Sequence, residues 1–177
     1  MNLPTVVVLA SGRGERFRAS GGQGSKLHAR LGSATVLEHT LAAVRASGLS
    51  WHLEAGGHPG MGDSIAAGVR ATATAQGWLI LPGDLPLLRP ATLRRVATEA
   101  AAAPVLRPAY QGQAGHPVRF DRVCAPALMA LHGEAGAAAV LRAHGVQLLE
   151  VDDPGCVMDI DTVDDLARAE QWLASLG

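Results

Sequence analysis

The feature that most constrains the fold is a short apolar run that leads directly into a glycine-rich loop. Residues 6–10 read Val-Val-Val-Leu-Ala, and the loop that follows ends at Lys26. A continuous β-branched run bounded by glycine is typical of a strand that is buried on both faces of a parallel sheet. The sequence therefore predicts an α/β protein in which a glycine-rich turn follows the first strand.

Helical and strand patterns alternate along the rest of the chain. Helices are expected over residues 36–47, from Asp63 or Ser64 to Ala73, and over 90–100, 125–131, 135–144 and 162–176; strands are expected over 78–81, 105–110, 116–120 and 146–151. The strands 105–110 and 116–120 pair either as a hairpin or as a bent excursion. This alternation implies right-handed βαβ crossovers and one open, doubly wound, mostly parallel sheet, with residues 1–177 forming a single domain. A ligand of such a sheet binds beyond the carboxyl ends of the strands.

Composition excludes several classes of partner. A chain of 177 residues with 48% hydrophobic content is large enough for one buried core. A net charge of -1 and an aromatic fraction of 3% argue against binding to nucleic acid or to an anionic membrane surface. Cys124 and Cys156 lack CxxC spacing, and the N-terminal segment carries no basic region before its short apolar run. We therefore expect a cytoplasmic protein without disulfides.

Lys26 is the only lysine among the 15 basic residues of the chain. A compact ammonium suits a polyphosphate, whereas an isolated lysine in a loop is more often only solvated. The segment that begins at Gly12 matches only the first two glycines of a dinucleotide fingerprint, because Phe17 stands where the third belongs. A Walker A loop is excluded, because Ser25 precedes Lys26. What remains is a loop of bare backbone N–H groups able to approach phosphate oxygens closely. Arg16 and Lys26 would neutralise the phosphate charge.

The loop resembles the L-A-x-G-x-G-x-R…K signature of the MobA-like nucleotidyltransferases, which transfer a nucleoside monophosphate from an NTP. Further segments occur in the order of that family, at residues 60–69, 81–86, 112–118 and 159–162. Ala10-Ser11 in place of a double glycine, and the elements Gly115–Val118 and Asp159–Thr162, resemble the molybdenum cofactor cytidylyltransferases (MocA-like) more than the guanylyl enzymes. The resemblance covers most of the chain and implies a Rossmann-like nucleotidyltransferase fold.

The resemblance also implies a set of site residues. The nucleotide-binding residues would be Leu9, Ala10, Ser11, Gly12, Gly14, Arg16, Lys26, Met61 and Ser64. Arg16, Lys26 and Asp84 would be catalytic, Asp84 with Asp161 or Asp159 would hold Mg²⁺, and Gly115 and His116 would contact the acceptor. Structural roles stay open as alternatives: a helix cap for Ser64, a turn aspartate for Asp84, helix-terminal charge for Asp161 and a turn for His116.

The implied reaction moves CMP from CTP onto the molybdenum cofactor, a phosphorylated acceptor, and releases pyrophosphate. Hand-over of the product to a molybdoenzyme or its chaperone is implied as well. Two departures keep alternatives open: Gly48 and Gly60 are too close for the usual strand, helix and strand, which predicts a truncated sheet edge, and Ala138 replaces an expected basic residue. The alternatives are transfer to another small phosphorylated acceptor and a degenerate relative that binds nucleotide or cofactor without catalysis.

Overall fold

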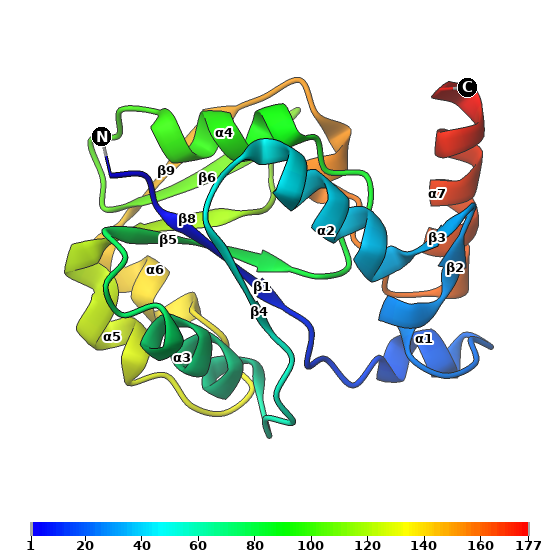
Figure 1. The fold of residues 1–177 in the computed structure, drawn as a ribbon, viewed down its shortest axis with the longest axis horizontal. Helices are drawn as coiled ribbons and strands as arrows, with labels where there is room; N and C mark the ends of the chain where they lie inside the picture. The colour runs from blue at the N-terminus through cyan, green and yellow to red at the C-terminus, as the bar shows by residue number, and fades with distance from the viewer. Residues whose placement is uncertain (1, 177) are drawn as a thin grey trace.

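The computed structural model describes residues 2–176 and contains one seven-stranded sheet (Figure 1). Its strands are β1 (Thr5–Leu9), β4 (Trp51–Glu54), β5 (Gly77–Pro82), β6 (Val105–Tyr110), β7 (Gln113–Ala114), β8 (Val118–Asp121) and β9 (Val146–Glu150). Their order is β4-β1-β5-β8-β6-β7, and β9 also pairs with β6. Strands β4, β1, β5, β6 and β9 run in one direction, and β7 and β8 run in the other. The prediction of a mostly parallel sheet is confirmed.

Helices cover both faces of the sheet, as a doubly wound fold requires (Figure 1). Helices α2 (Val36–Ser47) and α4 (Pro90–Thr98) lie on one face, and α3 (Met61–Ala71), α5 (Ala125–Met129) and α6 (Ala138–His144) lie on the other. At one end of the sheet, α1 (Glu15–Ala19), the hairpin of β2 (Arg30–Leu31) and β3 (Ala34–Thr35), and α7 (Val163–Leu176) form an annex. No helix within residues 2–176 is long and apolar enough to span a bilayer.

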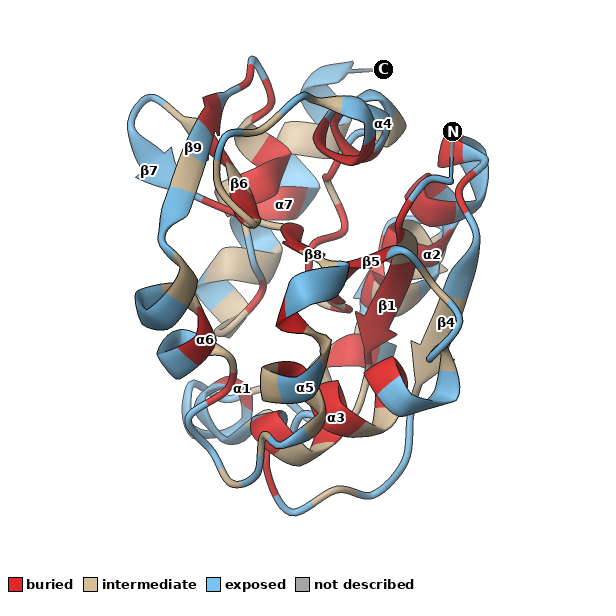
Figure 2. Ribbon diagram, turned by 90° about the vertical axis from the view of Figure 1, so that its left-hand side faces the viewer, coloured by how far each residue is buried: buried red, intermediate tan, exposed pale blue. Residues whose placement is uncertain are grey.

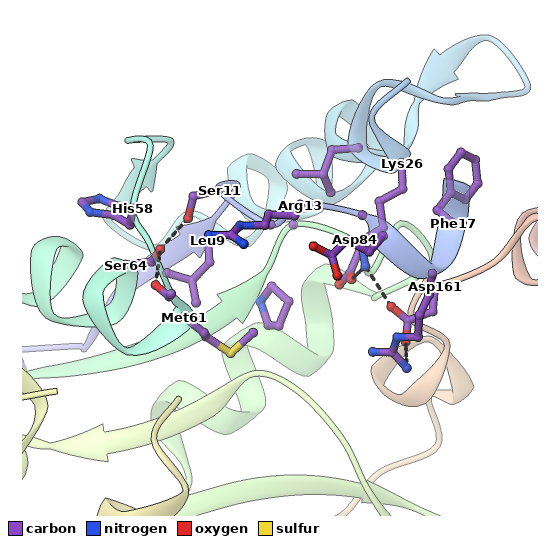
Figure 3. Close-up of a pocket in the computed structure, with 18 of the residues that line it drawn as sticks. Leu9, Ser11, Arg13, Phe17, Lys26, His58, Met61, Ser64, Asp84 and Asp161 are labelled. Carbon is purple, nitrogen blue, oxygen red and sulfur yellow. Dashed lines mark hydrogen bonds and ion pairs between the residues drawn. The ribbon is translucent and has the colours of Figure 1, made fainter. Parts of the chain in front are cut away.

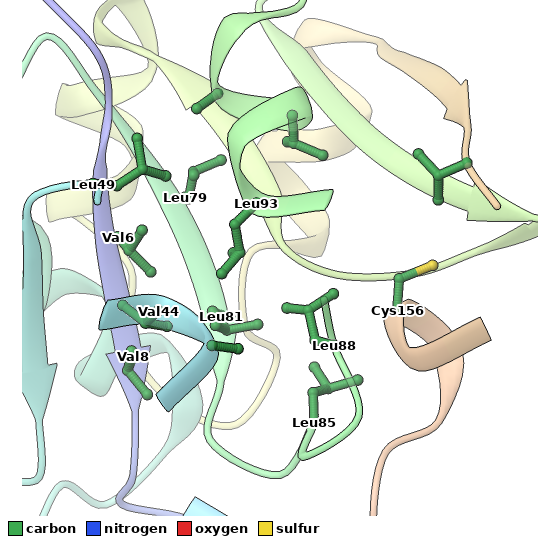
Figure 4. Packing of buried hydrophobic residues seen from close by; sticks show 14 of the residues in the cluster. Val6, Val8, Val44, Leu49, Leu79, Leu81, Leu85, Leu88, Leu93 and Cys156 are labelled. Carbon is green, nitrogen blue, oxygen red and sulfur yellow. The ribbon is translucent and has the colours of Figure 1, made fainter. Parts of the chain in front are cut away.

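Strand β1 lies between β4 and β5, and its side chains from Val6 to Leu9 are buried on both faces (Figure 2). Val6 and Val8 face the layer of α2 and α4, where they join a cluster with Leu81 and Leu93 (Figure 4). Val7 faces the opposite layer and packs in a cluster with Ile65 of α3. Burial on both faces explains why this strand is a continuous apolar run rather than an alternating one.

Several predicted boundaries are wrong. Helix α3 ends at Ala71 instead of Ala73, and α5 ends at Met129 instead of residue 131; four further differences have a visible structural reason. Helix α3 begins at Met61 instead of Asp63 or Ser64, because Gly60 is its N-cap. Helix α4 ends at Thr98, so Ala100 lies outside it; the Arg119 guanidinium donates to backbone carbonyls at the end of this helix.

The other two corrections involve glycine and proline. Helix α6 begins at Ala138 instead of residue 135, because Gly133 and Gly136 have positive φ angles of 74° and 55°. Strand β8 begins at Val118 instead of His116, because the His116 N–H donates to the Cys156 carbonyl rather than to the sheet. Of the two arrangements considered for strands 105–110 and 116–120, neither holds in simple form: β6 turns directly into β7, and β8 then pairs with both β6 and β5.

The sheet edge beyond β1 consists of one strand, β4, within the described residues. Helix α2 ends at Gly48 in the left-handed conformation, with φ 73°, and β4 begins at Trp51. The short stretch up to Gly60 therefore supplies one edge strand and a loop, residues 55–60, in agreement with the truncated edge predicted from the sequence. That loop leads from the carboxyl end of β4 to the start of α3.

Candidate active site

A cavity of about 390 Å³ opens beyond the carboxyl ends of β1 and β5 (Figure 3). Ten residues predicted from the sequence lie on its wall: Leu9, Ser11, Gly12, Gly14, Arg16, Lys26, Met61, Ser64, Asp84 and Asp161. Ala10 is not among the lining residues, and its N–H donates to the Glu54 carbonyl at 2.9 Å. The structure thus brings together four segments that are far apart in the sequence, residues 9–26, 61–64, 84 and 161, at the edge of the sheet where parallel α/β proteins bind ligands.

The loop after β1 presents unpaired backbone donors to this cavity. The N–H groups of Ser11, Gly12 and Arg13 make no backbone hydrogen bond to any residue of the described chain. Gly14 adopts φ 62°, a left-handed conformation that glycine tolerates best, and it caps α1. Free amides beside open space at Gly12 are suited to phosphate oxygens.

Lys26 lies at the centre of the charged part of the cavity. Its Nζ is 2.7 Å from Asp84 Oδ2 and 2.8 Å from Asp161 Oδ1, and Arg16 lies 3.0 Å from the other oxygen of Asp161. Burial of the ammonium lowers the pKa of Lys26, but the two carboxylates outweigh this effect, so the pKa is raised above its ordinary value. Lys26 therefore remains charged at any physiological pH.

Hydrogen bonds hold the backbone around Asp84 against β1 and against the turn that precedes α7. The Gly83 N–H donates to the Leu9 carbonyl at 2.9 Å, and the Thr40 hydroxyl donates to the Gly83 carbonyl at 2.8 Å. A side chain at Gly83 would place its Cβ 3.0 Å from the Leu9 carbonyl oxygen. The Ile160 N–H donates to the Asp84 carbonyl at 2.9 Å. These contacts place Asp84 beside the Asp159–Thr162 turn.

Three carboxylates converge at this point. One oxygen each of Asp84, Asp159 and Asp161 lies within 4.8 Å of the other two. Asp84 Oδ1 is buried and has no hydrogen-bond partner among the described residues. Burial of the Asp159 carboxylate away from water, together with the negative charges of Asp84 and Asp161, raises the pKa of Asp159. An all-oxygen cluster with an unsatisfied carboxylate oxygen fits a hard divalent cation such as Mg²⁺ or Mn²⁺.

The Asp159–Thr162 turn is itself held by a capping box. Asp165 Oδ2 accepts hydrogen bonds from the N–H groups of Asp161 and Thr162, at 3.0 and 2.7 Å, and the Asp165 N–H donates to the Thr162 hydroxyl at 3.2 Å. Burial raises the pKa of Asp165, but these hydrogen bonds outweigh it and keep the pKa below its usual value. This capping box orients the backbone that carries Asp161.

A second cavity of about 270 Å³ adjoins the first and shares four of its charged residues. Arg16, Lys26, Asp84 and Asp161 line both cavities. Gly115 and His116, the predicted acceptor residues, line only the second, as does Asp159. Two ligands bound side by side would therefore meet at Lys26 and the carboxylates.

His116 is a neutral group in this second cavity. Burial, and the nearby charge of Arg107, lower the pKa of His116 to about 4. Its Nδ1 is buried and has no hydrogen-bond partner within residues 2–176. The Arg107 guanidinium donates to the Gly115 carbonyl at 3.1 Å, and this bond helps to hold the Gly115–His116 segment in place. A neutral imidazole with an unsatisfied nitrogen is suited to a polar ligand.

Ser64 does not cap its helix, so the structural alternative considered for it is wrong. The N-cap of α3 is Gly60, and the Ser64 hydroxyl lies 2.5 Å from the Ser11 hydroxyl. The two hydroxyl groups join the loop after β1 to the first turn of α3. They lie together on the wall of the first cavity (Figure 3).

Sequence reasoning missed a second part of that wall. His58, Pro59, Gly60 and Glu134 also line the first cavity. The cluster of glycines from residue 56 to 62 was the available signal, because a Cβ at Gly60 would lie 2.4 Å from the Gly133 carbonyl oxygen. Glu134 stands where the resembled family tends to have Asp, but it was not named as a site residue. It reaches the cavity because its loop packs against α3; the Gly62 N–H donates to the Gly133 carbonyl at 2.8 Å.

The chain is similar to several proteins of known structure. It resembles Rv0371c from Mycobacterium tuberculosis H37Rv, with 26% identity, a TM-score of 0.79, and coverage of 96% of this chain and 98% of that one. A further structure of Rv0371c is a complex with manganese; it has 26% identity, a TM-score of 0.72, and coverage of 96% and 98%. A nucleotidyl transferase from Methanothermobacter thermautotroptrophicus has the same fold, with 22% identity, a TM-score of 0.81 and complete coverage of both chains.

A comparison with curated proteins gave no match. The model of the MobA-like NTP transferase domain matches residues 43–148, which is more than half of the chain. The matched segment contains Met61, Ser64, Asp84 and His116, whereas the glycine-rich loop and Lys26 precede it. The chain therefore belongs to the MobA-like NTP transferase domain family, and it is a nucleotidyltransferase.

Proposed function

We propose that this protein transfers CMP from CTP to the molybdenum cofactor, a phosphorylated acceptor, and releases pyrophosphate, with Mg²⁺ bound at the acidic cluster. The observation that carries the proposal is the position of Lys26, whose ammonium contacts Asp84 and Asp161 on the wall shared by both cavities. A transfer between two phosphorylated ligands requires cationic groups at the point where they meet. Lys26 and Arg16 stand at that point.

The first cavity suits a nucleoside triphosphate. Its phosphates would lie along the free amides of the loop after β1, with Arg16 and Lys26 beside the β- and γ-phosphates. Positive charge at that position stabilises the pyrophosphate as it leaves. Nucleotidyl transfer needs no covalent intermediate, because the acceptor oxygen attacks the α-phosphorus in line with the leaving group. Holding both ligands in register is then the main contribution of the protein.

The acidic cluster supplies the ligands that a divalent cation needs. Asp84, with Asp161 or Asp159, would hold Mg²⁺, which prefers one or two carboxylates together with substrate phosphates. When bound, the cation would neutralise charge on the phosphates. The ammonium of Lys26 now contacts the same carboxylates, so it would turn toward the phosphates when the substrate is present.

The second cavity would hold the acceptor. Its only lysine or arginine side chains among the described residues are Arg16 and Lys26, so the acceptor phosphate would share these cations with the triphosphate. His116 would contact the acceptor as a neutral hydrogen-bonding group. The preference for CTP and for the molybdenum cofactor rests on Ala10-Ser11 and on the Gly115–Val118 and Asp159–Thr162 elements. A related fold occurs in molybdopterin-guanine dinucleotide biosynthesis protein A from Archaeoglobus fulgidus, at 19% identity.

A second candidate is the same transfer to another small phosphorylated acceptor. Any acceptor with a single phosphate group would meet the same two cationic side chains, Arg16 and Lys26, in the second cavity. The cavity therefore supports this candidate as well as it supports the molybdenum cofactor. Product hand-over to a molybdoenzyme or its chaperone belongs only to the first candidate.

The test is pyrophosphate release from each of the four NTPs with Mg²⁺ or Mn²⁺, with molybdenum cofactor or a panel of sugar and polyol phosphates as acceptor. Release from CTP that depends on the molybdenum cofactor would support the proposal. Release with another acceptor would favour the second candidate. Tight binding of CTP without release under any condition would indicate a degenerate, non-catalytic relative.

A further inference from the structure

The carboxylate of Glu54, the last residue of β4, is an acceptor for three donors. Its Oε1 accepts from the Gly56 N–H at 3.1 Å and lies 2.8 Å from His58 Nε2, and its Oε2 lies 3.2 Å from His52 Nε2. The Glu54 side chain is only 13% exposed. Burial raises the pKa of Glu54, but the hydrogen bonds outweigh it, so the pKa lies below its ordinary value. The ionised carboxylate can only accept, so His58 donates from Nε2.

These hydrogen bonds shape the loop that forms one wall of the first cavity. His58 and Pro59 line that cavity, and Glu54 does not. The loop is compact, because a Cβ at Gly56 would lie 2.7 Å from His58 Nε2. On its other side, the Arg13 guanidinium donates to the Pro59 carbonyl at 3.2 Å. The loop is thus held between Glu54 and the glycine-rich turn after β1.

The position of this wall indicates which part of a ligand it would meet. Lys26 and Asp161 lie at one end of the cavity, whereas His58, Met61 and Ser64 lie at the other (Figure 3). Arg16 belongs to the first end, because it pairs with Asp161 at 3.0 Å. Phosphates belong at the end with the ammonium and guanidinium groups. The other end combines a thioether, a hydroxyl and the compact loop with Glu134 and with the Arg13 guanidinium, which is already bonded to Pro59. Its apolar and hydrogen-bonding groups are suited to the nucleoside.

We propose that Glu54 is a positioning residue for the nucleoside part of the triphosphate substrate, and that it acts through His58 on the loop of residues 55–60. This inference rests on the proposed function. It adds the residue that holds in place the cavity wall facing the nucleoside, which is the loop of residues 55–60. Glu54 does not line the cavity, so it would touch neither the substrate nor the reacting atoms. Loss of the hydrogen bond would let the loop move away and would weaken binding of the nucleoside without disturbing the phosphate end.

The experiment compares two probes on the same variants. The affinity for CTP depends on contacts along the whole cavity, whereas the affinity for inorganic tripolyphosphate depends only on contacts at the phosphate end. Affinities are measured by calorimetry for the wild-type protein, Glu54→Ala, His58→Ala, His58→Gln and His52→Ala, together with kcat and KM for pyrophosphate release. His52→Ala is the matched control, because His52 contacts the same carboxylate from the strand rather than from the loop.

We expect His58→Ala and Glu54→Ala to weaken CTP binding and raise its KM by roughly fivefold to tenfold. Tripolyphosphate affinity and kcat should stay within twofold of wild type. His58→Gln keeps a donor at this position and should restore part of the loss, and His52→Ala should resemble wild type.

Unchanged CTP affinity in the His58 variants would overturn the inference while the proposed function stands. Equal loss of tripolyphosphate and CTP, or equal effects of His52→Ala and His58→Ala, would also overturn it, because either would assign Glu54 a role in general stability. Failure of the wild-type protein to bind any NTP would instead overturn the proposed function, and this inference with it.

Discussion

The ammonium of Lys26 lies 2.7 Å from a carboxylate oxygen of Asp84, although 58 positions separate the two residues in the chain. Both side chains are largely buried, at 14% and 13% exposure. The contact joins the glycine-rich loop after β1 to the turn after β5. Strands β1 and β5 are parallel neighbours in the sheet. A buried pair of this kind is costly to break, because one unpaired charge is left behind.

Replacement of Asp84 by Asn should lower kcat for pyrophosphate release by roughly 10² or more, because a carboxylate that would hold the cation is lost. Asp84→Ala should have at least the same effect on kcat. Circular dichroism and thermal melting check that the fold is intact, and the exposed Asp152→Asn is the control. Turnover of Asp84→Asn at the wild-type rate would remove Asp84 from the mechanism.

Binding of the divalent cation and of the triphosphate should be cooperative, because Lys26 contacts two of the carboxylates that would hold the cation. We expect tripolyphosphate to raise the affinity for Mn²⁺ by roughly tenfold, a usual size for such coupling. Electron paramagnetic resonance of free Mn²⁺ measures this, with the binding of Mn²⁺ by tripolyphosphate alone titrated separately and subtracted.

The variant Lys26→Met provides the comparison for that experiment. Without the ammonium, Mn²⁺ alone should bind more tightly than to wild type, and tripolyphosphate should enhance it less. The loss of a phosphate contact should also lower kcat for pyrophosphate release by about 10². Identical Mn²⁺ affinities of both proteins in the absence of tripolyphosphate would show that Lys26 does not compete with the metal.

Gly60→Ala should destabilise the protein, because the added Cβ would lie 2.4 Å from the Gly133 carbonyl oxygen. Overpacking of this kind typically costs about 1–3 kcal/mol in the free energy of unfolding. Urea denaturation measures the loss. Gly57→Ala is the matched control, since nothing lies within 4 Å of its added Cβ. Equal stability of the two variants would argue against close packing of α3 on the loop of Gly133.

His116 should make the stability of the protein depend on pH. Its pKa is about 4 in the folded state and about 6.5 in an unfolded chain, so between these values only the unfolded state takes up the proton. Stability should therefore fall as the pH is lowered from 6.5 toward 4, by roughly 3 kcal/mol at most from this group. The measurement is the free energy of unfolding as a function of pH.

His116→Gln cannot titrate and should lose this part of the pH dependence. The slope of stability against pH between 6.5 and 4 should become smaller than in wild type. Parallel curves for the two proteins would mean that His116 is not a buried neutral group.

The sequence by itself determined the fold class and the glycine-rich loop for local reasons, and it named most of the candidate charged residues through the family resemblance. The β-branched run of β1 shows that both of its faces are buried, and the turn residues around Asp84 show where β5 ends. The failure of the dinucleotide and Walker A patterns left a loop suited to phosphate. Helix boundaries were less accurate, because the start of α3 depends on the packing of Gly60 rather than on its own sequence.

Only the tertiary structure decided which of these residues meet. The Asp84 carbonyl accepts a hydrogen bond from Ile160, and this contact brings the acidic turn at Asp159 and Asp161 to the cavity. Glu54 and His58 had no recognisable pattern, because their role depends on a loop that folds back on the end of a strand. Local periodicity records which side of an element is buried, whereas a site built from several strand ends depends on contacts between distant segments, which periodicity does not encode.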